Sequence, residues 1–342
     1  NFKQASGTSR GILKTKETFF LKLIDKDQIG IGECGVFKGL SIDDRPDYEE
    51  KLSWLCNNMH QSESFLLNEL VEFPSIQFGL EQALLSLRNK DAFKLFPSKF
   101  TNSSAAININ GLIWMGNEAF MKQQIEEKIA TGFSTIKMKI GAIDFDAELK
   151  LLKSIRKNFS SEEIELRVDA NGAFKPNEAL EKLKRLSEFD LHSIEQPIQT
   201  RQWENMAFLC EKSPLAIALD EELISLEEAE KEKMLQTVNP SYIILKPSLL
   251  GGLRKSNNWI NIATKNNIKW WATSALESNI GLNAIAQWVY GKSANMKQGI
   301  GTGKLFSNNI LSPYIIEKGH LKYFFDNNWD LALFEKYKKI ML

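Results

Sequence analysis

Two patterns of apolar residues divide the chain near residue 98. In the first part, alternating apolar residues predict strands at 11–24 and 29–34, and apolar residues at helical spacing predict helices at 45–59 and 75–93. A polar stretch containing proline, asparagine and serine follows these elements. We therefore expect an α+β domain over residues 1–98.

From residue 105 onward, short apolar runs alternate with amphipathic stretches. The predicted strands are 105–109, 135–139, 165–168, 193–194, 215–219, 242–245, 269–272 and 296–300. The predicted helices are 118–130, 145–158, 177–189, 201–210, 226–235, 251–265 and 281–290. This repeat is typical of an α/β chain folded as a (β/α)8 TIM barrel, while an open doubly wound sheet, which usually has fewer strands, stays open as an alternative.

The same pattern sets the domain organisation. We expect the barrel to span residues 99–310 and the first 98 residues to cap it. An aromatic-rich segment at 311–342 is expected to pack back on the capping domain.

Composition limits the classes of partner. The chain has 43 Lys and Arg against 43 Asp and Glu, so it carries no net charge that would attract nucleic acid or an anionic membrane. No apolar run approaches the length of a membrane span, and the polar first residues lack the apolar core of a signal peptide. Three widely spaced cysteines without a CxxC pair fit a reducing compartment, so we expect a cytoplasmic protein. The sequence leaves the oligomeric state open.

Six charged residues share one position in the pattern: each ends an apolar run. From the second lysine onward they follow one another at intervals of 25 to 30 residues. A TIM barrel places its active site at the carboxyl ends of its strands, so these side chains are expected to converge on one cavity. They are Lys137, Lys139, Asp169, Glu195, Asp220 and Lys246.

The three acids of this set predict a metal site. Asp169, Glu195 and Asp220 would repel one another in a shared cavity unless a cation lay among them. Oxygen ligands without histidine or cysteine favour Mg²⁺, with Mn²⁺ as a substitute. Each acid taken alone is better explained as a solvated loop residue, but the regular interval between the three reverses that preference and favours the metal.

The lysines predict acid–base chemistry. Lys137 and Lys139 lie two apart on a strand and leave the same face, so each should lower the pKa of the other and become a better base. Lys246 would approach from the opposite side of the cavity. A cation flanked by such lysines suits removal of a proton next to a carboxylate.

These residues carry a family resemblance. The chain resembles the muconate-lactonizing subgroup of the enolase superfamily and, within it, the o-succinylbenzoate synthases of menaquinone biosynthesis. The barrel motifs are KMK (137–139), VDANGA (168–173), IEQP (194–197), ALDEE (218–222), LKP (245–247), TSALES (273–278) and GIGTGKLF (299–306). The capping motifs are GIGECG (30–35) and GLSIDDRPDYE (39–49), so the resemblance covers essentially the whole chain.

The resemblance implies a carbon–oxygen lyase. The reaction would be a Mg²⁺-dependent syn-dehydration of the dicarboxylate 2-succinyl-6-hydroxy-2,4-cyclohexadiene-1-carboxylate to o-succinylbenzoate. Asp169, Glu195 and Asp220 would bind the metal, Lys139 would be the base with Lys137 beside it, and Lys246 would stabilise negative charge from the opposite face. Dipeptide epimerases and N-acylamino acid racemases of the superfamily use the same metal and lysine set, so they remain alternatives, with a non-catalytic barrel as a remote one.

Several other residues are candidates, each with a structural explanation as well. Asn171 is a candidate contact to the metal site or a turn residue, and Glu277 is a carboxylate near the metal side that could equally brace Lys246 or Lys139. Thr273 and Ser274 are expected to bind the succinyl part of the substrate or to cap the following helix.

The remaining candidates are backbone and loop positions. Gly299 and Gly301 would offer backbone N–H groups to a substrate carboxylate, or form a simple glycine turn. The spacing around them does not match a nucleotide P-loop. Arg10 could reach over the barrel mouth to a carboxylate, and is equally well explained as an exposed structural arginine.

Overall fold

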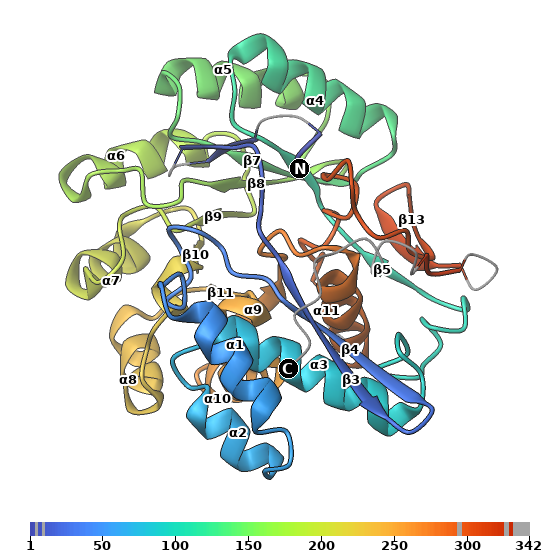
Figure 1. The fold of residues 1–342 in the computed structure, drawn as a ribbon. Coiled ribbons are helices and arrows are strands. Elements are labelled where there is room, and N and C mark those ends of the chain that lie inside the picture. The colour runs from blue at the N-terminus through green and yellow to red at the C-terminus, as the bar shows by residue number, and fades with distance from the viewer. Residues whose placement is uncertain (4–5, 9–10, 293–295, 325–327, 331–342) are drawn as a thin grey trace.

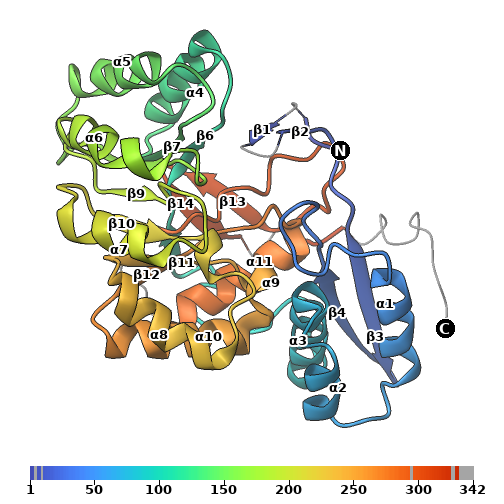
Figure 2. The same ribbon diagram turned by 90° about the vertical axis from the view of Figure 1, so that its left-hand side faces the viewer.

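The computed structural model describes residues 1–3, 6–8, 11–292, 296–324 and 328–330. Its first part is an α+β capping domain that lies beside a curled sheet surrounded by helices (Figures 1 and 2). The capping elements are β1 (Ser6–Thr8), β2 (Gly11–Leu13), β3 (Phe19–Asp25), β4 (Gln28–Cys34), α1 (Tyr48–Asn57), α2 (Glu63–Glu69) and α3 (Pro74–Asn89).

The capping core forms where β4 lies on α3. A Cβ on Gly32 would come within 1.8 Å of the Gly79 carbonyl oxygen, so only glycine allows this close approach. β3 and β4 form an antiparallel pair in which Phe19 faces Cys34 and Asp25 faces Gln28. The strand predicted at 11–24 is wrong as one element, because the chain breaks into β2, which pairs with β1, and β3.

Seven parallel strands form the wall of the barrel, in the order β12, β11, β10, β9, β8, β7, β6. They are β6 (Gly111–Ile113), β7 (Thr135–Lys139), β8 (Glu165–Asp169), β9 (Ser193–Glu195), β10 (Ile217–Leu219), β11 (Tyr242–Leu245) and β12 (Lys269–Ala272). The predicted α/β barrel with a capping domain is thus confirmed, and the strands that the structure describes do not form an open doubly wound sheet.

Closure of the barrel differs from the prediction. The expected eighth strand at 296–300 is reduced to single bridges, Gln298 to Ile109 and Gly299 to Thr273. The expected first strand at 105–109 becomes β5 (Ala106–Asn108), which pairs antiparallel with β14 instead of entering the barrel wall. β6 takes its place after the chain passes Asn110, whose N–H donates to the Gln298 carbonyl.

Helices cover the outside of the wall (Figure 1). Their apolar residues, at helical spacing, pack against the outward-facing residues of the strands in one large core. They are α4 (Glu118–Ala130), α5 (Phe145–Arg156), α6 (Pro176–Ser187), α7 (Trp203–Lys212), α8 (Glu228–Val238), the short α9 (Pro247–Leu250), α10 (Gly252–Lys265) and α11 (Asn279–Gly291), with a 3-10 turn at Glu221–Leu223. No helix in the described part of the chain is long and apolar enough to cross a bilayer.

The C-terminal segment contacts both parts of the molecule. β13 (Tyr314–Glu317) and β14 (His320–Tyr323) form a hairpin that adds to β5 at the side of the barrel. Trp329 stacks on Phe93 with ring centroids 4.3 Å apart, in a cluster that includes Ile31 of β4. The domain limits at 98 and 310 stay predictions.

Candidate active site

The carboxyl ends of five neighbouring strands bring the six predicted charged residues together. Strand register aligns Lys139 with Asp169, and Asp169 with Glu195. Asp220 directly follows β10, and Lys246 directly follows β11. Because parallel strands end on the same edge, these side chains share one end of the barrel.

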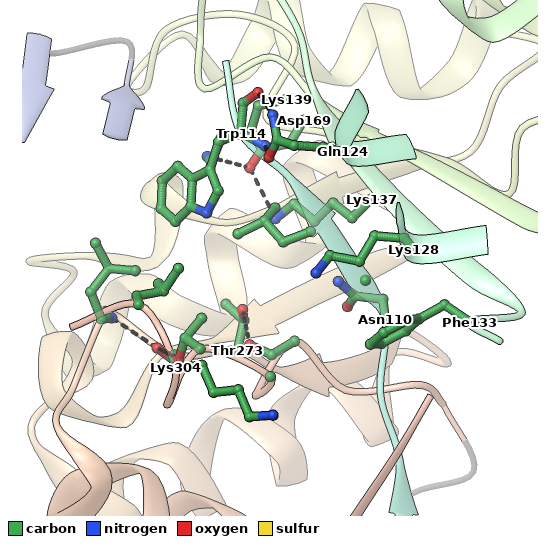
Figure 3. Close-up of a pocket in the computed structure, with 18 of the residues that line it drawn as sticks. Asn110, Trp114, Gln124, Lys128, Phe133, Lys137, Lys139, Asp169, Thr273 and Lys304 are labelled. Carbon is green, nitrogen blue, oxygen red and sulfur yellow. Dashed lines mark hydrogen bonds and ion pairs between the residues drawn. The ribbon is translucent and has the colours of Figure 1, made fainter. Parts of the chain in front are cut away.

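Ion pairs join the six side chains in two groups, and Figure 3 shows Lys137, Lys139 and Asp169 of the larger group. The ammonium of Lys137 lies 2.5 Å from Glu195 Oε2 and 2.9 Å from Asp169 Oδ2. Lys139 Nζ lies 2.9 Å from the same Asp169 oxygen, and Lys246 pairs with Asp220. Each acid therefore has a lysine partner, and Asp169 has two.

Burial makes these charges strongly interdependent. Asp169, Glu195 and Asp220 are only 1%, 2% and 2% exposed. Burial would raise the pKa of Asp169, but the charges of Lys137 and Lys139 outweigh it and hold that pKa well below its usual value. Burial and the neighbouring Asp169 charge raise the pKa of Glu195 well above its usual value.

The predicted lowering of the lysine pKa values is wrong for Lys137. Burial alone would lower its pKa, but Asp169, Glu195 and Asp220 together raise it. The pKa of Lys246 is raised in the same way, because Asp220 outweighs burial. The sequence argument counted the neighbouring ammonium groups and a cation, whereas in this structure the carboxylates dominate.

The buried acids offer oxygens to a cation. Glu195 Oε1 and Asp220 Oδ1 are buried without a hydrogen-bond partner, which is costly unless a positive group approaches them. As the side chains stand, the described residues bring no three His, Cys, Asp or Glu side chains into a metal-binding arrangement, and Lys137 bridges two of the acids instead. The donor set, oxygen only and on neighbouring strands, nonetheless fits a hard divalent cation.

Asn171 connects this cluster to a fourth acid. Its Oδ1 accepts a hydrogen bond from Lys139 at 2.6 Å, and its Nδ2 donates to Glu221 Oε1 at 2.9 Å. Its φ of 44° is the left-handed turn conformation, so the explanation as a turn residue holds, and the contact to the metal site stays a prediction. Glu221 was missed, although it directly follows Asp220 in the sequence and lines the same cavity.

A cavity of about 570 Å³ opens beside the cluster. Lys137, Lys139 and Lys246 line it, and Trp114 lies on the same cavity wall (Figure 3). Phe37 belongs to an apolar cluster between the capping domain and the barrel and also lines the cavity. The cavity can therefore hold a small molecule next to the buried charges.

The predicted substrate-binding residues lie in this cavity wall, with one correction. Thr273, Ser274, Gly299 and Gly301 all line the cavity. Thr273 Oγ1 donates to the Gly299 carbonyl, and the Gly299 N–H donates to the carbonyl of Ala272. The prediction that Gly299 offers its N–H to a substrate is therefore wrong, because barrel closure uses that group.

Glu277 stands apart from the cluster. Glu277 is fully buried and accepts hydrogen bonds from the Ser248 hydroxyl at 2.5 Å and the Ala275 N–H at 2.8 Å. It holds the loop after β11 instead of bonding to Lys246 or Lys139. Arg10 lies outside the described residues.

Comparison with known proteins supports this picture. The family profile described as Enolase C-terminal domain-like matches residues 120–322. The o-succinylbenzoate synthase of Desulfotalea psychrophila is 45% identical over 351 aligned residues, which cover 94% of this chain and 95% of that protein.

Two solved structures resemble this chain in fold. The crystal structure of MenC from Desulfotalea psychrophila LSv54 superimposes with a TM-score of 0.82 at 43% identity, covering 90% of this chain and 94% of that one. A substrate-liganded L-Ala-D/L-Glu epimerase from Bacillus subtilis gives a TM-score of 0.81 at 17% identity over 94% and 92% of the two chains, and so shares the fold. The capped barrel carries lysines and acids at its strand ends, as described above. Together with the family profile and the 45% identical relative, this shows that the chain belongs to the enolase superfamily.

Proposed function

We propose that the protein is an o-succinylbenzoate synthase. It would convert 2-succinyl-6-hydroxy-2,4-cyclohexadiene-1-carboxylate to o-succinylbenzoate and water, a step of menaquinone biosynthesis. The observation that carries this proposal is the set of lysines and buried acids at the strand ends beside one cavity. The similarity to the Desulfotalea psychrophila synthase along nearly the whole chain supports the choice of reaction.

Lys139 is the proposed base. In its neutral form it removes the proton from the ring carbon that carries the carboxylate, breaking a C–H bond. The electron pair forms the new ring double bond as the C–O bond to the hydroxyl breaks, and Lys139 returns the proton to the departing hydroxyl on the same face. The products are water and an aromatic ring, whose stability drives the reaction forward.

The other two lysines would supply positive charge next to the substrate and the base. Lys246 is expected to face the substrate from the side opposite Lys139 and to stabilise negative charge that develops on the carboxylate. Lys137, held by Asp169 and Glu195, keeps a positive charge beside Lys139. Asn171 directs the Lys139 ammonium through its 2.6 Å hydrogen bond.

Asp169, Glu195 and Asp220 are the proposed ligands of Mg²⁺, for which Mn²⁺ would substitute. When bound, the divalent cation supplies positive charge next to the substrate carboxylate. The unpartnered oxygens Glu195 Oε1 and Asp220 Oδ1 support this assignment, because they are buried acceptors that a cation would satisfy. We also place the enzyme in the cytoplasm, where its three free cysteines would stay reduced.

An aromatic product makes the proposal directly testable. Purified protein incubated with the substrate and Mg²⁺ should produce the ultraviolet absorbance of o-succinylbenzoate, and removal of the metal by a chelator should stop it. The alternative is an epimerase, which would use Lys139 and Lys246 as two bases. Absence of product, together with deuterium exchange into dipeptides in D₂O, would replace the proposed dehydration with epimerisation.

A further inference from the structure

Gln196 connects the turns after the three strands that carry the proposed metal ligands. It directly follows Glu195 at the end of β9. Its backbone carbonyl accepts a hydrogen bond of 2.7 Å from the N–H of Gly172, in the turn after β8. Its side-chain Oε1 accepts from the backbone N–H groups of Asp220 at 3.2 Å and Glu222 at 3.3 Å, in the turn after β10. One residue therefore bonds to the turns on both sides of its own.

The other half of the Gln196 amide is held as well. Its Nε2 donates to the carbonyl of Ile198 at 3.1 Å and to Glu222 Oε2 at 3.4 Å. Glu222 Oε1 in turn accepts from the backbone N–H of Arg201 and the indole N–H of Trp203, each at 2.9 Å. Gln196 and Glu222 are both 1% exposed, so these bonds are shielded from water. Both polar atoms of the amide therefore have partners of the matching kind.

The backbone of Gln196 points to a role for its side chain. Its φ is 39°, in the left-handed region, which costs conformational energy for a residue with a long side chain. Glycine or asparagine would relieve this cost. Neither has a side chain long enough to reach the N–H groups of Asp220 and Glu222, so the strained conformation is kept together with the reach of the glutamine.

The backbone pairing of the strands leaves one acid for Gln196 to hold. β9 and β10 have three residues each and pair in register at two positions, the last of which joins Glu195 to Ala218. Asp220 lies beyond these pairs, and the Gln196 side chain bonds to its N–H instead. The negative charges of Glu195 and Asp220 repel each other, so a fixed backbone is needed to keep them at one spacing.

We propose that Gln196 is the positioning residue that sets the spacing of Asp169, Glu195 and Asp220 for a divalent cation. This inference rests on the metal assignment within the proposed function and deepens it, because it names the residue that holds the ligands together. Gln196 is buried and does not line the cavity, so it acts through the acids and not on the substrate.

The test measures Mg²⁺ binding by calorimetry, with protein freed of metal by a chelator. Gln196→Met removes the amide and should weaken Mg²⁺ binding about 10- to 100-fold, as is typical when a residue that orients metal ligands is lost. Gln82→Met in α3 is the matched control. Gln82 is likewise buried, accepts from the Glu33 N–H at 3.3 Å and donates to the carbonyls of Phe78 and Glu33. This control should lose stability to urea but keep its Mg²⁺ affinity within about threefold of wild type.

A second variant, Gln196→Asn, separates the reach of the side chain from folding. Asparagine adopts the left-handed conformation readily, but its side chain is shorter by one C–C bond, about 1.5 Å. Its amide therefore does not reach the N–H groups of Asp220 and Glu222. This variant should be at least as stable to urea as Gln196→Met and should show the same loss of Mg²⁺ affinity.

The outcomes separate this inference from the proposed reaction. Wild-type protein that binds Mg²⁺ but forms no o-succinylbenzoate would overturn the synthase proposal and leave the role of Gln196 standing. Wild-type affinity for Mg²⁺ in folded Gln196→Met or Gln196→Asn, or an equal loss of affinity in Gln82→Met, would overturn the role of Gln196 even in an active enzyme. Wild-type protein that does not bind Mg²⁺ would overturn both the metal assignment and this inference.

Discussion

Asn171 offers the sharpest test of how the proposed base is positioned. Its amide lies between Lys139 and Glu221, with contacts of 2.6 and 2.9 Å. Removing the side chain leaves Asp169 as a partner of Lys139, so the lysine stays in the site but loses its second anchor. A hydrogen bond to a charged group contributes about 1.5–3 kcal/mol, so its loss from the transition state would lower kcat about 10- to 150-fold.

The backbone of Asn171 decides which substitution to use. Its φ is 44°, a conformation that glycine adopts freely and alanine adopts at a cost of about 1 kcal/mol. Asn171→Gly therefore removes the side chain without adding strain, and Asn171→Ala adds the strain. Both variants should lose kcat equally, whereas the alanine variant should be less stable to urea by about 1 kcal/mol.

The assay is steady-state formation of the aromatic product, paired with urea unfolding. Full kcat in Asn171→Gly would refute the positioning argument. A kcat that falls in Asn171→Ala and not in Asn171→Gly would show that the backbone turn, and not the amide, matters.

Two further predictions concern stability. Burial raises the pKa of Glu148 to about 7, so its ionisation lowers the free energy of unfolding as pH rises from about 4.5 to 7. Glu148→Gln should remove this loss of stability. The variant should have a larger free energy of unfolding than wild type at pH 8 and nearly the same value at pH 5. Urea unfolding at both pH values measures it, and an equal effect at both would contradict the argument. Glu33 of the capping domain accepts hydrogen bonds from the N–H and hydroxyl of Ser278 and from the Gly281 N–H. Glu33→Gln should therefore lower the free energy of unfolding by about 1–3 kcal/mol. The control Glu17→Gln, at an exposed residue, should leave it almost unchanged. Equal thermal midpoints for these two variants would show that Glu33 does not hold the capping domain to the barrel.

The repeat of apolar runs predicted the barrel well because local patterns encode it. The helix predicted at 118–130 and the strand predicted at 135–139 coincide with α4 and β7. Strand ends follow directly from such runs, so the positions of the six charged side chains at those ends could be inferred from the sequence, whereas Glu221, one residue further along, was missed.

Barrel closure could not be read in the same way. Whether residues 105–109 join the wall or pair with β14 depends on a hairpin more than 200 residues away. The lysine pKa values also depend on which partners are close in space: the prediction placed the acids around a cation, whereas in the structure they pair directly with the lysines.

The most direct test of the central claim is product formation by Lys139→Met compared with wild type, with Mg²⁺ present. A general base contributes about 10²- to 10⁴-fold, so the variant should lose at least that much of kcat while keeping the wild-type affinity for o-succinylbenzoate. Lys139→Met that forms o-succinylbenzoate at the wild-type rate would contradict the account, because the proton would then be leaving to another group.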